Sequence, residues 1–556
     1  MSSARHLGLA ALALGAAACR PPIEAPPGTL VVVKELQATW VENFNPFSAG
    51  GGARWPTQAG VYEPLFIYNS AQGEFVPALA TAWEWIEGGA TLALTLREGV
   101  RWSDGAPLTA SDVAYTFRLI QREPALDSQG LGPRIREVVV VDEHTVHLRL
   151  LAPFSPALGR VAQVPIVPAH IWEGVADPAG WNNPAPVASG PFTEVLRFET
   201  QVFDLGRNPH HWDPAAAAGV ERLRMPAMSG NDQANVALIH GEIDWCGTFI
   251  PAVDRVFVSR DRAHHVDWSP PTGSTIFLYA NAAQAPFDDA RVRKALSLAI
   301  DRDQLVRLAM HGTTHGSDGT GLSDKHDAWR DPEALALGDW VAHDPARAAA
   351  LLDEAGWRVG EDGLRRDAAG EVLRAELEVV SGWSDWLRAA QVISVQLRAV
   401  GVDAPVRARD FGAWMDGLSR GNFRLSFGWS GDGPTPYDLY AGLLGSAALR
   451  PVGEPAASQW HRLADPESDV LLTAFEQATD PGEQRRLAAG LQRRFATLAP
   501  AIPLFPSPSW GQANTTRIEG FPSAADPYAL LSPHASPESL LVLRRLRARP
   551  PAGDGT

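Results

Sequence analysis

The hydrophobic residues of this chain recur with two periods, and the switch between the periods is clearest over residues 91–120. Leucines alternate with other residues from 91 to 96, which predicts a half-buried strand. Asp104 and Gly105 then predict a tight turn. Thr109 and Asp112 form the T-x-x-D pattern that caps the start of a helix, and apolar residues follow at near-helical spacing (Val113, Phe117 and Ile120). The stretch therefore predicts a strand, a turn and a helix in that order.

Comparable units recur along the rest of the chain. Residues 138–141 and 146–150 are two short β runs that predict a hairpin. Residues 234–241, 346–355 and 386–400 predict helices that end at or just before a glycine. Strands that alternate with helices in this way are typical of doubly wound sheets. The pattern therefore predicts an α/β protein with two lobes.

The composition fits a globular protein of more than one domain. The chain has 556 residues, of which 45% are hydrophobic and 20% charged, which is enough for two or three domains with sizeable cores. Its formal net charge of −16 argues against a nucleic-acid partner, because phosphates select basic surfaces. The sequence contains no glycine-rich phosphate loop and predicts no cofactor.

The N-terminus predicts export and a lipid anchor. Residues 1–19 hold one early arginine and then an apolar run too short to span a bilayer, which predicts a signal peptide. The segment Ala16-Ala17-Ala18-Cys19 is similar to a bacterial lipobox, in which Cys19 would carry the lipid; plain cleavage is the alternative. Residues 20–29, rich in proline, predict a tether. Cys246 would then have no disulfide partner.

The segment around the first predicted helix resembles a known signature. It is similar to that of the family 5 extracellular solute-binding proteins, the peptide, nickel and oligosaccharide receptors of ABC importers. The matching residues are Arg97, Gly99, Val100, Trp102, Asp104, Gly105, Pro107, Leu108, Thr109, Asp112 and Val113. The resemblance extends over roughly residues 30–541. This signature marks a fold and does not identify a ligand.

The resemblance implies a two-lobed periplasmic-binding-protein fold, type II and similar to cluster C, with an extra domain inserted in the first lobe. The boundaries that follow are residues 30–64, 190–283 and 510–543 for lobe I, 65–189 for the inserted domain and 284–509 for lobe II. Residues 544–556 are predicted to be a disordered tail.

The resemblance also points to ligand-binding residues at the end of a predicted strand. In oligopeptide-binding members a strand ends in W-x-x-D, and the aspartate pairs with the free amine of the ligand; Trp429 and Asp432 match this pattern. The next residues, Gly433-Pro434-Thr435-Pro436-Tyr437, depart from the peptide binders and are closer to the oligosaccharide binders. Asp432 would then accept a hydroxyl group. A turn residue beside Gly433 is the structural alternative.

Three more residues complete the candidate site. Trp245 is a candidate stacking platform for a sugar ring, with core packing as the alternative. Asn45 could hydrogen-bond a polar ligand from the first lobe, and a structural turn is an equal alternative. Tyr437 ends the segment that follows Asp432.

Other functions match the sequence less well. Residues 417–421 read G-x-S-x-G around Ser419, but a helix precedes and a strand follows, the reverse of a nucleophile elbow. His311 and His315 have helical metal-ligand spacing, yet they lie in a glycine-rich stretch without the H-E-x-x-H glutamate. No metal site and no enzyme activity are predicted. A sensor or partner protein with the same fold remains an alternative.

The expected function is that of a receptor that closes around a solute. We expect a monomer, lipid-anchored on the periplasmic or extracellular face, that captures an oligopeptide between its lobes and delivers it to the permease subunits of an ABC importer. A short oligosaccharide is the alternative ligand, and the sequence alone leaves the choice open.

Overall fold

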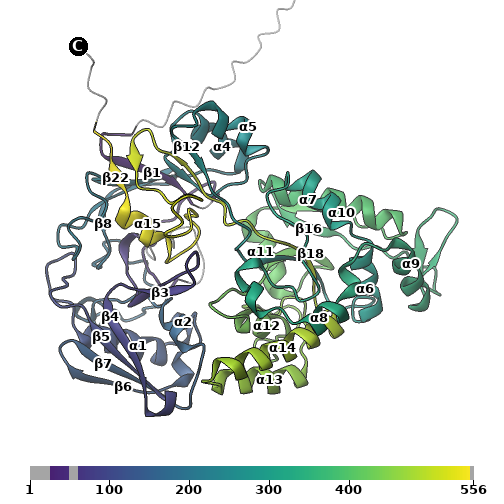
Figure 1. The fold of residues 1–556 in the computed structure, drawn as a ribbon, viewed down its shortest axis with the longest axis horizontal. Coiled ribbons are helices and arrows are strands. Elements are labelled where there is room, and N and C mark those ends of the chain that lie inside the picture. The colour runs from purple at the N-terminus through teal and green to yellow at the C-terminus, as the bar shows by residue number, and fades with distance from the viewer. Residues whose placement is uncertain (1–24, 35, 49–59, 551–556) are drawn as a thin grey trace, which may run out of the picture.

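The computed structural model describes residues 25–34, 36–48 and 60–550. Its strands form a seven-stranded, a five-stranded and a four-stranded sheet, together with three two-stranded pairs. Figure 1 shows two bodies side by side: lobe I with an inserted domain on the left, and lobe II on the right. The predicted α/β fold with two lobes and an insertion is confirmed.

The seven-stranded sheet builds lobe I around strand β1. β1 (Thr29–Val33) is completely buried, as its unbroken run of apolar residues requires, and it lies parallel to both β10 and β11. The strand order is β12-β20-β11-β1-β10-β9-β8. The remaining bounds are β8 (Phe192–Glu199), β9 (Val202–Arg207), β10 (Arg222–Pro226), β11 (Trp245–Cys246), β12 (His265–Asp267) and β20 (Gln512–Asn514); helix α4 (Asn231–Ile239) precedes β11.

The inserted domain is a four-stranded antiparallel sheet covered by helix α1 (Ala110–Arg122). Thr109 and Asp112 form a complete capping box at the start of α1, as the sequence predicts. The strand order is β4-β5-β7-β6, with bounds β4 (Ala80–Ile86), β5 (Thr91–Leu96), β6 (Ile135–Asp142) and β7 (Thr145–Leu150); β2 (Phe66–Asn69), β3 (Glu74–Pro77) and α2 (Ala157–Val161) lie at its border.

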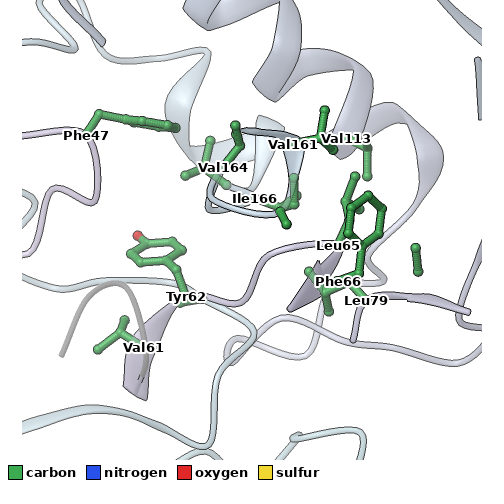
Figure 2. Packing of buried hydrophobic residues seen from close by; sticks show 14 of the residues in the cluster. Phe47, Val61, Tyr62, Leu65, Phe66, Leu79, Val113, Val161, Val164 and Ile166 are labelled. Carbon is green, nitrogen blue, oxygen red and sulfur yellow. The ribbon is translucent and has the colours of Figure 1, made fainter. Parts of the chain in front are cut away.

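The inserted domain shares one hydrophobic core with lobe I. Buried residues from β1, β9 and β10 belong to the same cluster as those of α1 and β5. Figure 2 shows part of this cluster, in which Leu65 and Phe66 lie together with Val113 and Val161. Lobe II has a separate core. The insertion and lobe I therefore form one packed body, and lobe II is the other.

The five-stranded sheet of lobe II has the order β17-β16-β18-β13-β19. β16 is parallel to both β17 and β18, so the carboxyl ends of these three strands lie at one edge. Helices pack on both faces of the sheet (Figure 1). The strand bounds are β13 (Thr275–Ala280), β16 (Leu377–Val380), β17 (Val406–Arg409), β18 (Leu425–Trp429) and β19 (Ile502–Pro506). The helices are α6 (Ala290–Leu298), α7 (Arg302–Ala309), α8 (Pro332–Leu337), α9 (Pro345–Glu354), α10 (Ser384–Ala399), α11 (Phe411–Arg420), α12 (Tyr437–Leu444), α13 (Pro466–Gln477) and α14 (Pro481–Leu498).

Two chain segments connect the lobes. Residues 268–274 lead from β12 to β13, and residues 507–511 return from β19 to β20. The two segments are hydrogen-bonded to each other: Ser509 N donates to Pro270 O at 2.7 Å, and Gly273 N donates to Ser507 O at 3.0 Å. Paired short crossovers of this kind form a hinge that can absorb backbone rotation while both lobes stay rigid.

Two predicted boundaries are wrong. The boundary at residue 283 assigns β13 to lobe I, but β13 pairs with β18 and β19 inside the lobe II sheet. The tail predicted from residue 544 begins too early, because α15 (Ser539–Arg545) continues into β22 (Arg547–Ala548), which pairs with β21 (Ile518–Glu519). Arg544 anchors this end, since it pairs at 2.7 Å with the fully buried Glu63.

Candidate functional site

Lobe II contacts the other body through helix α10 on one side. The amide of Asn231, the first residue of α4, donates to Ser384 Oγ at 3.2 Å, and its backbone N–H donates to Gly382 O at 3.2 Å. Gly382 has φ +86°, and a Cβ built on it would lie 2.7 Å from Ser229 O of lobe I. The same amide lies 3.5 Å from Oδ1 of the buried Asp385. We call this set of mostly backbone and amide contacts the α4–α10 contact.

A second set of contacts joins the inserted domain to helix α13. Arg134 donates two hydrogen bonds to the carboxylate of Glu476, at 2.8 and 2.7 Å. The backbone N–H of Ser155 donates to Glu476 O at 2.6 Å. Nearby, Arg160 pairs with Asp438 at 3.2 Å. This charged set, the insert–α13 contact, has the paired geometry that makes arginine–carboxylate bonds strong and directional.

An aromatic row lies on lobe II between these two contacts. Phe411, Trp383 and Trp429 each come from the carboxyl end of one of the three parallel strands β17, β16 and β18. Their ring centroids lie 5.9 Å apart from Phe411 to Trp383 and 6.4 Å apart from Trp383 to Trp429. Trp383 and Trp429 are half-buried and Phe411 is exposed. The carboxyl edge of parallel strands is where open α/β sheets bind ligands.

The row rests on buried aromatic rings that fix its geometry. Trp414 and Trp386 lie beneath it, with ring centroids 5.3 and 6.3 Å from Trp429. The indole N–H of Trp414 donates to Ser426 Oγ at 3.1 Å, so this buried ring has a hydrogen-bond partner. The exposed faces of the row therefore belong to a rigid wall and are suited to stacking against a flat or ring-shaped ligand.

Asp432 lies just past the row, at the end that faces the insert–α13 contact. Its carboxylate is 41% exposed, and Oδ1 receives the ammonium of Lys325 at 2.6 Å and the backbone N–H of Gly433 at 3.0 Å. The closest approach of Lys325 to this carboxylate is thus a 2.6 Å ion pair. The Asp432 carboxylate is already paired with a cation, and its exposed part can still accept a donor on a ligand.

The opposite body places two ionisable groups near this pair. Burial raises the pKa of Tyr68, and the nearby charges of Asp432 and Glu538 raise it further while Lys325 lowers it. Burial also raises the pKa of Glu538, which accepts backbone N–H groups from Leu530 and Ser70. Lys325 of lobe II therefore interacts electrostatically with both Glu538 and Tyr68 of the opposite body.

Three predicted site residues have structural roles instead. Trp245 is 0% exposed and its indole N–H donates to Leu531 O at 2.7 Å, so it has no free face for a sugar. Asn45 is buried, and its amide donates to Pro178 O and Trp181 O, as a turn residue does. Tyr437 stacks on Phe475 and donates its hydroxyl to Glu476. Trp245 and Tyr437 therefore pack in the interior, and Asn45 stabilises a turn.

Three site residues were missed from the sequence: Trp383, Phe411 and Lys325. No local motif marks Trp383 in the sequence, because only the strand order places it beside Trp429. Lys325 had a signal that could have been used: it is one of only three lysines among the 48 lysine and arginine residues of the chain. Cys19, the predicted lipidation site, lies outside the described residues.

The residues considered for other chemistry do not assemble into such sites. Ser419 lies in α11, where its hydroxyl donates to Asp416 O, and so it is not on a strand-to-helix elbow. His311 bonds to Arg388 and His315 to Asp324. Over the described parts of the chain, no three histidine, cysteine or acidic side chains are grouped to hold a metal ion. No helix in those parts is both long and apolar enough to cross a membrane.

Comparison with known proteins gives consistent results. The family profile described as "Bacterial extracellular solute-binding proteins, family 5 Middle" matches residues 74–449. The nickel-binding periplasmic protein of Escherichia coli (strain K12) is 27% identical over 425 residues, which cover 73% of this chain and 77% of that protein. The periplasmic oligopeptide-binding protein of Thermotoga maritima, solved with bound mannohexaose, superposes with a TM-score of 0.86 at 26% identity over 95% of this chain and 99% of that one.

A peptide-bound protein shares the fold at lower similarity. The oligopeptide-binding protein AppA of Bacillus subtilis, solved with a nonapeptide, superposes with a TM-score of 0.78 at 18% identity, covering 94% of this chain and 100% of that chain. This degree of identity shows a common fold and leaves the ligand open.

Proposed function

This chain belongs to the bacterial extracellular solute-binding proteins of family 5, the binding components of ABC transporters, and we propose that its ligand is a short, uncharged oligosaccharide. The ligand would lie against the aromatic row, between the α4–α10 contact and the insert–α13 contact. The lobes would close over it by rotation at the paired crossovers, and the closed form would deliver it to the permease.

The observation that carries the proposal is the aromatic row itself. Trp383 and Trp429 are half-buried rings that rest on a rigid wall of buried tryptophans. Apolar faces of sugar rings stack on such surfaces, while sugar hydroxyl groups need acceptors at the edge of the stack. The partly exposed carboxylate of Asp432 is such an acceptor, next to the row.

The charge balance also favours an uncharged ligand over a peptide amine. The carboxylate of Asp432 already holds an ammonium group, that of Lys325, at 2.6 Å. A ligand amine at the same carboxylate would lie close to this first cation, and like charges in a partly buried site repel strongly. A hydroxyl group can share the carboxylate without that repulsion.

Two features of the cellular arrangement are part of the proposal. We infer that Cys19 is lipidated and that residues 20–29 tether a monomeric receptor to the membrane surface. Mass spectrometry of the protein from membranes of the producing cell would detect the added lipid, and Cys19→Ala would release the protein in soluble form. Size-exclusion chromatography with light scattering would report the oligomeric state.

The ligand is best tested by native mass spectrometry of the fragment from residue 20 to 556, as purified and after refolding. A co-purified series of masses spaced by hexose or pentose units, lost on refolding, would support the proposal. Trp429→Ala should weaken binding of mannohexaose by about 1–3 kcal/mol, by analogy with stacking of bases on aromatic rings. Trp357→Ala, at a half-buried tryptophan elsewhere in lobe II, is the matched control. Equal affinities for both variants would contradict the role of the row.

An oligopeptide is the second candidate, and a specific observation favours it. The groups that interact around Asp432 include three carboxyls (Asp432, Asp438 and Glu538) and two cations (Lys325 and Arg160). The excess of acid would attract the amine of a peptide. Co-purified masses that match peptides, together with a loss of peptide affinity in Asp432→Asn, would move the protein to this class.

A further inference from the structure

Lys325 is an unusual residue in this chain. Arginine supplies all but three of the 48 lysine and arginine residues, yet a lysine stands beside the candidate site. An ammonium is a compact point charge on a flexible stem, whereas a guanidinium is a wide planar fork with five donors. A lysine can therefore fill one carboxylate oxygen and leave the second oxygen uncovered, which a bidentate arginine would not.

Lys325 is buried against the carboxylate of Asp432. Its side chain is only 7% exposed, and its Nζ lies 2.6 Å from Asp432 Oδ1. The neighbouring residue His326 is buried, and its Nε2 lies 3.1 Å from Gly433 O, which ties the segment of Lys325 to the loop of Asp432. Burial lowers the pKa of His326 to about 4, so this imidazole is neutral and Lys325 is the cation at this position.

Removal of Lys325 would make the surroundings of Asp432 more strongly negative. Asp432, Asp438 and Glu538 all interact electrostatically with Lys325 or with its immediate partners. Without the ammonium, these three carboxyls would have Arg160 as their remaining cation within the group, and Arg160 is committed to Asp438. A cationic group on a ligand would then find an open, negatively charged position at Asp432.

We propose that Lys325 determines the charge class of the ligand: its ammonium occupies the place that a ligand amine would take, and the exposed part of the Asp432 carboxylate is left to accept hydroxyl groups. This inference rests on the proposed function, because it explains why an acidic residue at the site would select an uncharged ligand. Lys325 is in this sense a specificity-determining residue.

The experiment compares neutral replacements of Lys325 with two controls. Lys325→Gln and Lys325→Met remove the charge, and the second keeps the aliphatic stem in case the first fails to fold. Lys325→Arg keeps the charge. Lys294→Gln makes the same substitution at a half-buried lysine of α6, near Asp339 and outside the site. Thermal unfolding verifies that each variant is folded, and isothermal titration calorimetry measures binding of three probes: mannohexaose, a hexapeptide with free termini, and the same hexapeptide N-acetylated.

We expect both neutral variants to bind the free-amine hexapeptide at least tenfold more tightly than the wild-type chain does, with no gain for the acetylated peptide. Mannohexaose should bind at least fivefold more weakly to them, because Asp432 loses the group that orients it. Lys325→Arg and Lys294→Gln should not gain affinity for the free amine. A neutral variant without that gain, or with an equal gain for the acetylated peptide, overturns the inference.

The same data separate this inference from the proposed function. Failure of the wild-type chain to bind mannohexaose counts against the oligosaccharide proposal. The inference about Lys325 is tested separately, by the affinity of Lys325→Gln for the free-amine hexapeptide. A wild-type chain that already binds the free-amine peptide as tightly as the variants would contradict both.

Discussion

The two contacts that join the bodies differ in their chemistry. The α4–α10 contact consists of a neutral amide, backbone groups and the close approach of Gly230 to Gly382. The insert–α13 contact consists of two ion pairs, with Arg134 and Glu476 partly exposed at 38% and 15%. The first depends on shape and the second on charge. Added salt should therefore weaken the insert–α13 contact and leave the α4–α10 contact nearly unchanged.

The largest effect on closure is expected at the α4–α10 contact, which depends on close fit. Gly382→Ala adds a Cβ 2.7 Å from Ser229 O of the opposite body, in addition to the strain of φ +86°. Overpacking of this kind costs about 1–3 kcal/mol, and we expect the closed form and ligand affinity to fall about tenfold or more. Small-angle X-ray scattering reports the closure and calorimetry the affinity.

Gly370→Ala is the matched control for this substitution. Gly370 has the same φ of +86°, but a Cβ there would meet no atom within 4 Å. It should lower the stability of lobe II through strain alone and leave closure unchanged. An equal loss of closure in both variants would show that backbone strain, and not the interlobe clash, is responsible.

A smaller effect on closure is expected at the insert–α13 contact, which depends on charge. Glu476→Gln keeps the shape of the insert–α13 contact and removes its charge, so the closed fraction should fall about fivefold, or about 1 kcal/mol for a partly exposed pair. Raising the salt concentration should reduce closure of the wild-type chain and have little effect on this variant. Glu483→Gln removes the charge from an exposed pair within α14 and serves as the control. Single-molecule fluorescence between labels on the two bodies measures the closed fraction.

The smallest effect concerns pH at the α4–α10 contact. Burial raises the pKa of Asp385 to about 6 at this contact, opposed by backbone hydrogen bonds and by Asn231. A carboxyl whose pKa is raised above its unfolded value of about 4 stabilises the folded form fully below that value, and the contribution is lost as pH rises through about 6. Opening should expose this carboxyl only in part, so its pKa in the open form should lie between these values, and we expect closure to be about threefold more favourable near pH 5 than near pH 7.5.

Asp385→Asn should remove this pH dependence. Asp244 provides an internal comparison, because burial raises the pKa of its carboxyl to about 6 as well, but it lies within lobe I and pairs with Arg517. Its protonation should affect global unfolding and leave closure unchanged. A closure equilibrium that keeps its pH dependence in Asp385→Asn would assign the effect to another group.

Site residues could be found from the sequence where they belong to a local pattern, and not where tertiary structure alone brings them together. The capping box at Thr109 and Asp112 was predictable, because it depends on residues three apart in the chain. Asp432 and Trp429 were found through a motif at the end of one strand. Trp383 and Phe411 were not, because they join the row only through the order of β17, β16 and β18. Trp245 was misassigned, because no local pattern tells a buried indole from an exposed one.

The sequence by itself determined the class of protein, the two α/β lobes, the insertion and most of the helices and strands. The class of protein and the insertion came from the resemblance to a known family, while the lobes, helices and strands follow from the periodicity of apolar residues and from local capping and turn chemistry, which act over a few positions. Tertiary structure decided the rest: the membership of β13 in lobe II, the docking of residues 544–550, the aromatic row and the Lys325–Asp432 pair. Each of these depends on which distant segments become neighbours, and packing of the whole chain sets that order.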